Sequence, residues 1–442
     1  SSDLTGTTIN VNGSVYTGED AGTNVGNVSF NGAVVLGTNV TVESTDGGGG
    51  SDGTVSFNGT VNADGAGNDR YLVVSAGGGS ASFSDDIGGL GELDAVDVDA
   101  ASIAVRQITV EDGSQLVGNA IDLNATAGTL TIGLGGADGT LDTTGEADGG
   151  DVVLSATGGI IIDDVDAGAV GGWTLTITTA GTNTQGDITI NDPVDASGGD
   201  ATANALRLNS GDGGNIAVSA KLGDTDALNG LTVPNANDAS FTDIDSVNGL
   251  SFTGDDFAST GTIDVSGAAV SITATDTGNA VEVISLATVD SNDQNVTLRT
   301  GGGNVGISTS LSATVGGAEL SIAGTGVGVP LGLGSAATDA AGTLWMSDAS
   351  LDNIGSGVSG PAGISFGRTG QTGNIEVNRS AGSLTVSEDL EFIVDGGANL
   401  TVSSNVDTLE GGATGKSITV SAAAGTVTPE RGNRYQGIVP LD

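Results

Sequence analysis

Two nearly identical stretches, GNVSFNGAV at 26–34 and GTVSFNGTV at 53–61, decide the fold of this chain. A third, less regular copy, GSASFSDDIG, occupies 79–88, so that the phenylalanine recurs after 27 and then 26 residues. Self-similarity at a fixed period of roughly 25 residues is typical of a solenoid, in which each coil buries its inner face only on neighbouring coils. The spacing therefore predicts that Phe30 and its two counterparts stack above one another inside the molecule.

Apolar residues alternate with small polar residues within each copy, as in VSF at 28–30, VVL at 34–36 and VTV at 40–42. This period of two is the pattern of a strand with one buried face. The segments between the strands are rich in Gly and Asn, which tolerate the positive φ angles of tight turns. One period therefore predicts three short strands, and successive coils would stack them in register, parallel, about 4.8 Å apart and wound right-handed.

Similar strands, each preceded by Gly, Asn or another small polar residue, recur along the rest of the chain. They include GTLTIGL at 128–134, GGDVVLSATGGIIID at 149–163, WTLTITT at 173–179, GDITIND at 186–192, GNIAVSA at 214–220, GTIDVSG at 261–267, QNVTLRT at 294–300, GNIEVNR at 373–379 and NLTVSSN at 399–405. The predicted fold is all-β, a right-handed parallel β-helix that runs continuously over 1–428, with its best-defined repeats at 26–88. A tandem array of β-sandwiches would need repeats of about 100 residues, which the sequence lacks.

The composition excludes several classes of function. The 442 residues contain no Cys and no His, which removes disulfides, thiol nucleophiles, Ser-His-Asp machinery and ordinary zinc sites. The chain has 55 acidic and 10 basic residues, a net charge of −45, whereas binding to nucleic acid requires clustered Lys and Arg. We also expect no membrane-spanning segment, because the long uncharged stretch at 320–338 is rich in glycine.

Three pairs of adjacent aspartates are the candidates for acid/base chemistry: Asp85-Asp86, Asp163-Asp164 and Asp255-Asp256. Some β-helices cleave polysaccharides with two facing carboxylates. Adjacent residues on a strand point to opposite faces, however, and the chain has only two Trp and three Tyr with which to bind a sugar. We interpret the pairs as solvated corner residues, and we expect no catalytic residues and no enzyme activity.

A partial calcium motif lies at 47–54, where GGGGSDGT resembles the GGxGxD nonapeptide at Asp52. The motif occurs once, and Thr54 stands where a large apolar residue belongs. Asp-Gly corners nevertheless supply the oxygen ligands that calcium prefers. We therefore expect no required cofactor and no specific metal site, with at most weak, scattered association of calcium.

One region resembles a known family. Met346 to Ile354 read MSDASLDNI and Gly373 to Val377 read GNIEV, and together they resemble a repeat unit, here 341–377, of the large filamentous-haemagglutinin-like exoproteins. The segments 27–44 and 293–313 are similar to the filler repeats of the same family. The resemblance implies a long β-helix that is secreted by a bacterium and acts as an adhesin or surface fibre.

The last residues, PERGNRYQGIVPLD at 429–442, depart from the repeat pattern and bring Arg431, Arg434 and Tyr435 together. The final 75 residues hold five of the ten basic residues but only nine of the 55 acidic ones. A solenoid end exposes unpaired strand edges that must be capped or paired. The tail is thus either a simple cap or an assembly contact, in which these three residues would meet the N-terminal strand at 7–15 of another copy, head to tail.

Taken together, the sequence favours a non-enzymatic secreted surface protein, either an adhesin stalk or the subunit of a self-assembling extracellular fibre. Its receptor on a host or surface is not specified by the sequence. The alternative is a carbohydrate-binding or ice-binding solenoid, for which TLTITT at 174–179 is suggestive although the pattern is not sustained. A polysaccharide-degrading β-helix enzyme is the least favoured alternative.

Overall fold

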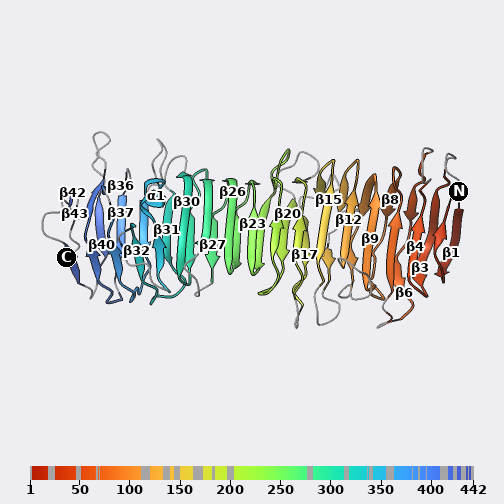
Figure 1. The fold of residues 1–442 in the computed structure, drawn as a ribbon, viewed down its shortest axis with the longest axis horizontal. Coiled ribbons are helices and arrows are strands. Elements are labelled where there is room, and N and C mark those ends of the chain that lie inside the picture. The colour runs from red at the N-terminus through yellow and green to blue at the C-terminus, as the bar shows by residue number, and fades with distance from the viewer. Residues whose placement is uncertain are drawn as a thin grey trace. The chain divides into compact units, whose positions relative to one another are not determined.

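Of the residues that the computed structural model describes, 59% lie in strands and 2% in helix, which confirms the predicted parallel β-helix. It describes residues 2–17, 25–45, 51–65, 68, 70–110, 120–132, 140–143, 150–162, 173–181, 185–196, 204–275, 282–312, 318–335, 337, 342–354, 363–380, 382–386, 389–394, 396–408, 417–421, 426–429, 435–436 and 438–439. The chain forms two compact units, Ser1–Asn237 and Asp238–Asp442, and each is a stack of coils whose paired strands are all parallel (Figure 1).

The first unit has three sheets, one on each side of its coils. The first contains β1 (Ser2–Val11), β3 (Val28–Leu36), β5 (Val55–Phe57), β8 (Ser80–Phe83), β10 (Ser102–Val105), β13 (Leu130–Ile132), β16 (Ile160–Ile162) and β19 (Val194–Ala196), and β6 (Val61–Ala63) pairs with the end of β3. The second contains β2 (Val15–Tyr16), β4 (Val40–Glu43), β7 (Tyr71–Ser75), β9 (Ala95–Ala100), β12 (Ile121–Ala125), β15 (Val152–Ala156), β18 (Ile188–Ile190) and β21 (Ile216–Val218). The third contains β11 (Ile108–Thr109), β14 (Thr140–Asp142), β17 (Trp173–Thr178), β20 (Asn204–Asn209) and β22 (Gly230–Asn235).

The second unit is built in the same way. One sheet contains β25 (Leu250–Gly254), β27 (Val270–Ala274), β29 (Val296–Thr300), β31 (Glu319–Gly324), β34 (Gly363–Gly367), β37 (Asp389–Ile393), β40 (Ile418–Ser421) and β43 (Ile438–Val439). Another contains β23 (Asp238–Phe241), β26 (Asp256–Val265), β28 (Glu282–Asp290), β30 (Gly303–Ser312), β33 (Leu344–Met346), β32 (Leu331–Leu333), β35 (Ile375–Val377), β38 (Leu400–Val402) and β41 (Val427–Pro429), with β24 (Ile244–Ser246) on the end of β26. A short sheet contains β36 (Ser383–Val386), β39 (Asn405–Thr408) and β42 (Tyr435–Gln436), and α1 spans Asp348–Asp352.

The predicted phenylalanine stack is present in the first unit. Phe30 pairs in register with Phe57, and Phe57 with Phe83, and all three side chains are at most 1% exposed. The ring centroids lie 4.5 and 4.9 Å apart with an interplanar angle of 6° in both contacts. Stacked aromatic pairs contribute about 0.5 to 1.5 kcal/mol each beyond the burial of their area, so the equal spacing in the sequence stabilises neighbouring coils.

The glycine that opens each copy of the repeat is required by close packing between coils. A Cβ atom at Gly53 would lie 2.5 Å from the carbonyl oxygen of Gly26, and one at Gly79 would lie 2.0 Å from that of Gly53. Any side chain at these positions would push the coils apart. The second sheet therefore turns into the first through a column of glycines, since these residues lie between β2 and β3, β4 and β5, and β7 and β8.

Asparagine and aspartate side chains just before a strand accept hydrogen bonds from the backbone of the next coil. The side chain of Asn27 accepts a hydrogen bond from the backbone N–H of Thr54 at 3.0 Å. Asp151 accepts from the N–H of Asp187 at 2.8 Å, and Asp187 accepts from the N–H of Asn215 at 2.7 Å. These side chains satisfy corner N–H groups that the sheets leave unpaired, so part of the acidic composition has a structural role.

Candidate functional site

The strongest concentration of polar contacts among the described residues surrounds α1. Ser347 caps this helix, and its hydroxyl accepts a hydrogen bond from the N–H of Ser350 at 3.1 Å. The acidic Asp348 occupies the first turn, where a carboxylate is favoured by the helix dipole. Leu351 is 1% exposed and anchors the helix in the core. The SDASLD corner of the sequence is thus a single helical turn.

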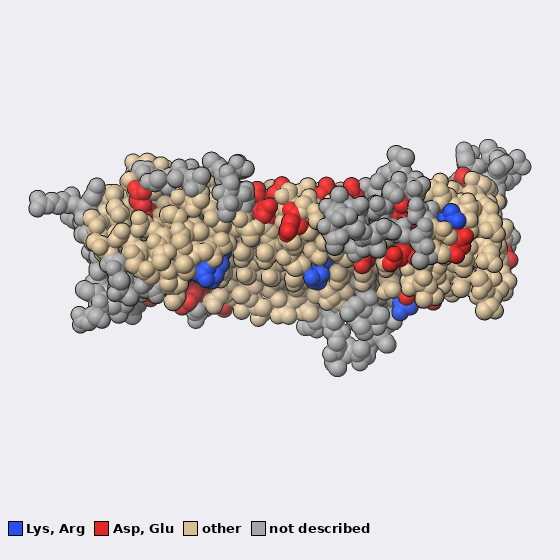
Figure 2. All heavy atoms as spheres, turned by 90° about the horizontal axis from the view of Figure 1, so that it is seen from below, with Lys and Arg blue, Asp and Glu red and all other residues tan. Residues whose placement is uncertain are grey.

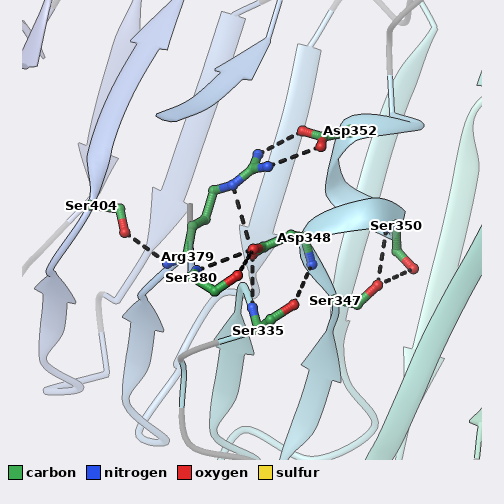
Figure 3. A network of polar contacts seen from close by, with 8 residues as sticks. All are labelled: Ser335, Ser347, Asp348, Ser350, Asp352, Arg379, Ser380 and Ser404. Atoms are coloured by element: carbon green, nitrogen blue, oxygen red, sulfur yellow. Dashed lines mark hydrogen bonds and ion pairs between the residues drawn. The ribbon is translucent and has the colours of Figure 1, made fainter. Parts of the chain in front are cut away.

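Asp348 is the centre of the network (Figure 3). One of its carboxylate oxygens accepts a hydrogen bond from the N–H of Ser335 at 2.8 Å, and the other accepts from the N–H of Ser380 at 3.1 Å and from the Ser380 hydroxyl. The N–H of Asp348 donates in turn to the Ser335 hydroxyl at 3.1 Å. A single carboxylate thereby joins the segments that follow β33, β32 and β35.

Arg379 completes the network from β35. Its guanidinium donates to both oxygens of Asp352, at 2.7 and 3.0 Å, and its Nε lies 3.7 Å from Asp348. Its backbone N–H donates to the Ser404 hydroxyl at 2.7 Å, so the segment after β38 is included as well. The Arg379 side chain is only 5% exposed, and the two carboxylates offset the cost of removing its charge from water.

The surroundings of Asp348 act on its pKa in both directions. Burial alone would raise the pKa of this carboxyl, but the hydrogen bonds from Ser380 and Ser335 and the charge of Arg379 outweigh burial and lower it. Asp348 is therefore ionised at neutral pH and serves as an acceptor. Because its oxygens bind donors of the chain itself, the arrangement fits a structural clamp better than an acid/base site.

The network lies where the order of strands departs from the order of the chain. β33 lies between β30 and β32, so the sheet order is β30, β33, β32, β35. After β31 the chain forms β32, then returns one layer to form β33 and α1. The residues of the network follow β33, β32, β35 and β38, four adjacent strands of one sheet, and they fasten this reversed segment to the layers around it.

Two of the three predicted aspartate pairs are described, and both lie at corners. Asp85 and Asp86 both contact one guanidinium nitrogen of Arg106, at 2.9 and 3.2 Å. Asp255 accepts a hydrogen bond from the Thr275 hydroxyl at 2.7 Å, and Asp256 is the first residue of β26. Asp163 and Asp164 lie outside the described residues.

Asp52, the residue of the partial calcium motif, bridges two coils. Its carboxylate accepts the N–H of Gly78 at 2.6 Å, while 46–50 lie outside the described residues. Within the described ranges, no group of three or more acidic side chains is arranged to hold a metal ion. The expectation of weak calcium association stays a prediction.

The threonines at 174–178 alternate with buried Leu175 and Ile177 along β17. Their neighbours on β20 are Ala205, Arg207 and Asn209, so the row of threonines does not extend to the next strand.

The residues predicted for assembly are described only in part. Arg431 and Arg434 lie outside the described residues, and Tyr435 belongs to β42, which pairs with β39. β43 likewise pairs with β40, so the tail contributes strands to two sheets. The assembly role of these three residues stays a prediction.

The sequence analysis missed a group of carboxylates on the second sheet of the first unit. Asp97 and Asp99 lie on β9, and Asp122 lies beside Asp97 on β12. Burial, followed by the charges of Asp99 and Asp122, raises the pKa of Asp97 to about 6. The alternation in AVDVDA at 95–100 predicts that Asp97 and Asp99 point outward. The sequence does not show that this strand lies in register with IDL at 121–123, which places Asp122 beside Asp97.

Comparison with protein-family models, with curated proteins and with solved structures returned no match. What the geometry defines is a class, the parallel β-solenoid proteins. Among the described residues, no helix has the length and hydropathy needed to cross a membrane.

Proposed function

We propose that this chain is a non-enzymatic secreted surface protein, either the stalk of an adhesin or the subunit of an extracellular fibre. The observation that carries the proposal is the repetition of the architecture itself. In each unit an inward row of apolar side chains stacks coil on coil, while the outward rows consist mainly of short polar side chains. Such a stack is stabilised locally by each coil and can be extended without a new core.

The charge of the surface supports the same role. The chain has a net charge of −45, and Figure 2 shows acidic side chains at many places on the visible face and basic ones at few. A strongly acidic surface stays soluble and repels other copies and anionic surfaces except at dedicated contacts. This suits a protein that projects into the medium.

The carbohydrate-binding or ice-binding alternative depends on a flat ladder of hydroxyl groups. Outward Ser and Thr do form one row in the second unit: Ser251, Ser271, Thr297, Ser321 and Ser365. Glu391 ends this row, and Arg299 interrupts the neighbouring row after Thr253 and Thr273. Because the hydroxyl surface is narrow and interrupted, we favour the role of a stalk or fibre subunit over carbohydrate or ice binding by this face.

The location can be tested on cells that produce the protein. Immunogold electron microscopy with antibodies against the purified chain should label the outside of intact cells. Labelling that requires permeabilised cells would contradict a surface role. Negative-stain images of the labelled material then distinguish single projecting stalks from fibres.

The fibre version has its own test. Light scattering of the purified chain at low salt should detect assemblies that a variant with Arg431→Gln and Arg434→Gln does not form. An Arg207→Gln, Arg299→Gln variant, which loses the same charge elsewhere, should still assemble. Strictly monomeric wild-type protein at high concentration would leave the stalk as the proposed role.

A further inference from the structure

A groove of about 400 Å³ lies on the outer face of the sheet that contains β31, β34, β37 and β40 in the second unit. Its lining includes Glu319, Gly363, Ser365, Asp389, Glu391 and Ile393. Glu319, Gly363 and Asp389 form one row across the strands, and Ser365 and Glu391 belong to the next row. The groove therefore opens where small residues of β34 lie between larger side chains of β31 and β37.

Gly363 creates this opening, although the backbone does not need glycine there. A Cβ atom at Gly363 would meet nothing closer than the carbonyl oxygen of Asp389, at 3.8 Å, and its φ is not in the left-handed region. Gly53, by contrast, is forced by the coil below it. Gly363 is the first residue of β34, and a glycine in a strand often marks the close approach of a ligand or of another backbone. No backbone approaches closely here, which leaves room for a ligand.

The walls of the groove present fixed carboxylates. Asp389 accepts hydrogen bonds through one oxygen from the N–H and the hydroxyl of Ser417, at 2.7 and 3.0 Å. Glu391 accepts through one oxygen from the Ser421 hydroxyl. Within the described part of the chain, the second oxygen of each carboxylate accepts no hydrogen bond, and no Lys or Arg lines the groove. These bonds hold the two carboxylates in place for an incoming donor.

The chemistry of the lining selects the ligand. Ile393 offers aliphatic surface beside the carboxylates, which matches the methylene stem and cationic head of Arg or Lys. No aromatic side chain lines the groove to stack on a sugar, and the described carboxylates do not form a metal cluster. We propose that this groove binds the Arg or Lys side chains of a basic peptide segment in a partner protein. The proposal does not depend on the surface role proposed above.

The test is peptide binding to the full-length chain. A fluorescein-labelled peptide of alternating Arg and Ser is titrated with the protein by fluorescence anisotropy, and the same peptide with citrulline in place of Arg serves as the neutral probe. The Arg peptide should bind and the citrulline peptide should not. Equal binding of the two peptides would overturn the proposal.

Two sets of charge variants separate the groove from general attraction to an acidic protein. Glu319→Gln, Asp389→Asn and Glu391→Gln together should weaken binding of the Arg peptide by about tenfold, which corresponds to about 1.4 kcal/mol. Asp97→Asn, Asp99→Asn and Asp122→Asn remove the same charge in the other unit and should change binding by less than about twofold. Equal weakening by the two sets would show attraction without a site and would overturn the proposal.

Filling the groove gives an independent readout. Gly363→Val adds a side chain that the backbone accommodates, so circular dichroism and thermal melting should stay native while binding of the Arg peptide falls by about tenfold. Unchanged binding by the folded Gly363→Val variant would place the peptide elsewhere. Calorimetric titration with calcium chloride alone completes the test, because stoichiometric binding of calcium that is lost in the groove variant would identify a metal site instead.

Discussion

Asp97 and Asp348 are both partly withdrawn from water, yet the structure moves their pKa values in opposite directions. Burial and the neighbouring charges of Asp99 and Asp122 raise the pKa of Asp97 to about 6. Burial also acts against the charge of Asp348, but donors from Ser380, Ser335 and Arg379 lower its pKa. The partner supplied by the next coil, rather than the residue type, decides whether an aspartate stabilises the fold at neutral pH.

Replacing Asp97 by Asn should stabilise the protein at pH 7 but not below about pH 4. Because the folded pKa is raised above the unfolded value of 3.8, the wild-type carboxylate costs stability above about pH 6, and this cost disappears as the pH falls toward 3.8. Asp97 is only half-buried, so we expect about 1 kcal/mol after solvent screening. Thermal melting of both proteins between pH 3 and pH 8 checks this, and an equal gain at both extremes would contradict it.

Replacing Phe57 by Asp should destabilise the first unit by several kcal/mol. Phe57 is 1% exposed between two other rings, and an unpaired charge there is either buried at high cost or forces the coils apart. Ser56→Asp is the matched control, because it adds the same charge to the same strand on the outward face and should cost no more than about 0.5 kcal/mol. Urea unfolding measures both, and similar midpoints would show that Phe57 is not an interior stack member.

At the scale of elements, the reversed order of β32 and β33 explains why α1 and its polar network exist. A chain that steps back one layer must turn sharply twice, and the turns expose backbone groups that the sheets cannot pair. Ser335, Asp348 and Ser380 pair these groups, and Arg379 holds α1 through Asp352. We infer that the network fastens the insertion rather than forming a reactive centre.

Removing the central carboxylate, Asp348, should destabilise the protein more than removing the outer one, Asp352. Asp348→Ala deletes three hydrogen bonds beside a buried guanidinium and should destabilise the second unit by about 2 to 4 kcal/mol. Asp352 is 59% exposed, but its two hydrogen bonds hold the buried Arg379 guanidinium, so Asp352→Ala should cost about 1 to 2 kcal/mol. Chemical denaturation at pH 7 compares the two variants, and equal losses would contradict a network centred on Asp348.

The Asp348 contribution should also be sensitive to acid. Its folded pKa is lowered, so its stabilisation is complete above the unfolded value of 3.8 and is lost as the pH falls further. The difference in stability between wild type and Asp348→Ala should therefore narrow in acid. A difference that is constant from pH 7 to pH 2 would show that the side chain acts through packing alone.

At the scale of the whole molecule, a net charge of −45 opposes the compact state through self-repulsion. Several carboxylates of the described corners, such as Asp52, Asp151 and Asp187, accept hydrogen bonds from neighbouring coils, but acidic side chains still repel one another across the surface. The core of stacked apolar rows must outweigh this repulsion, and solution conditions that screen charge should favour the fold.

Raising sodium chloride from about 0.01 M to 0.5 M should raise the melting temperature, because the screening length falls from about 30 Å to less than 8 Å. Differential scanning calorimetry checks this, with calcium chloride at matched ionic strength as the comparison. A larger increase with calcium would support the predicted weak association of that ion. A melting temperature that falls with sodium chloride would show that stabilising ion pairs outweigh repulsion.

The sequence by itself determined the strands, the inward face of each strand and the stacking of Phe30, Phe57 and Phe83. These follow from local rules, since a period of two sets the buried face and a fixed interval sets the register. The glycine at the head of each repeat is different, because the sequence predicts only a turn residue there, and it is the structure that shows two coils too close for a Cβ atom.

Only the tertiary structure decided the exchange of β32 and β33, the network around Asp348, the neighbours of Asp97 and the groove over Gly363. Each of these features depends on which residue of another coil lies opposite in the sheet. Coils differ in length, and a change in length alters which residues pair but leaves the alternation within each strand unchanged. Alternation predicts which way a side chain points, whereas the free energy of a charge or an opening is set by neighbours in other coils, from 13 residues away for Ser335 and Asp348 to 44 for Glu319 and Gly363.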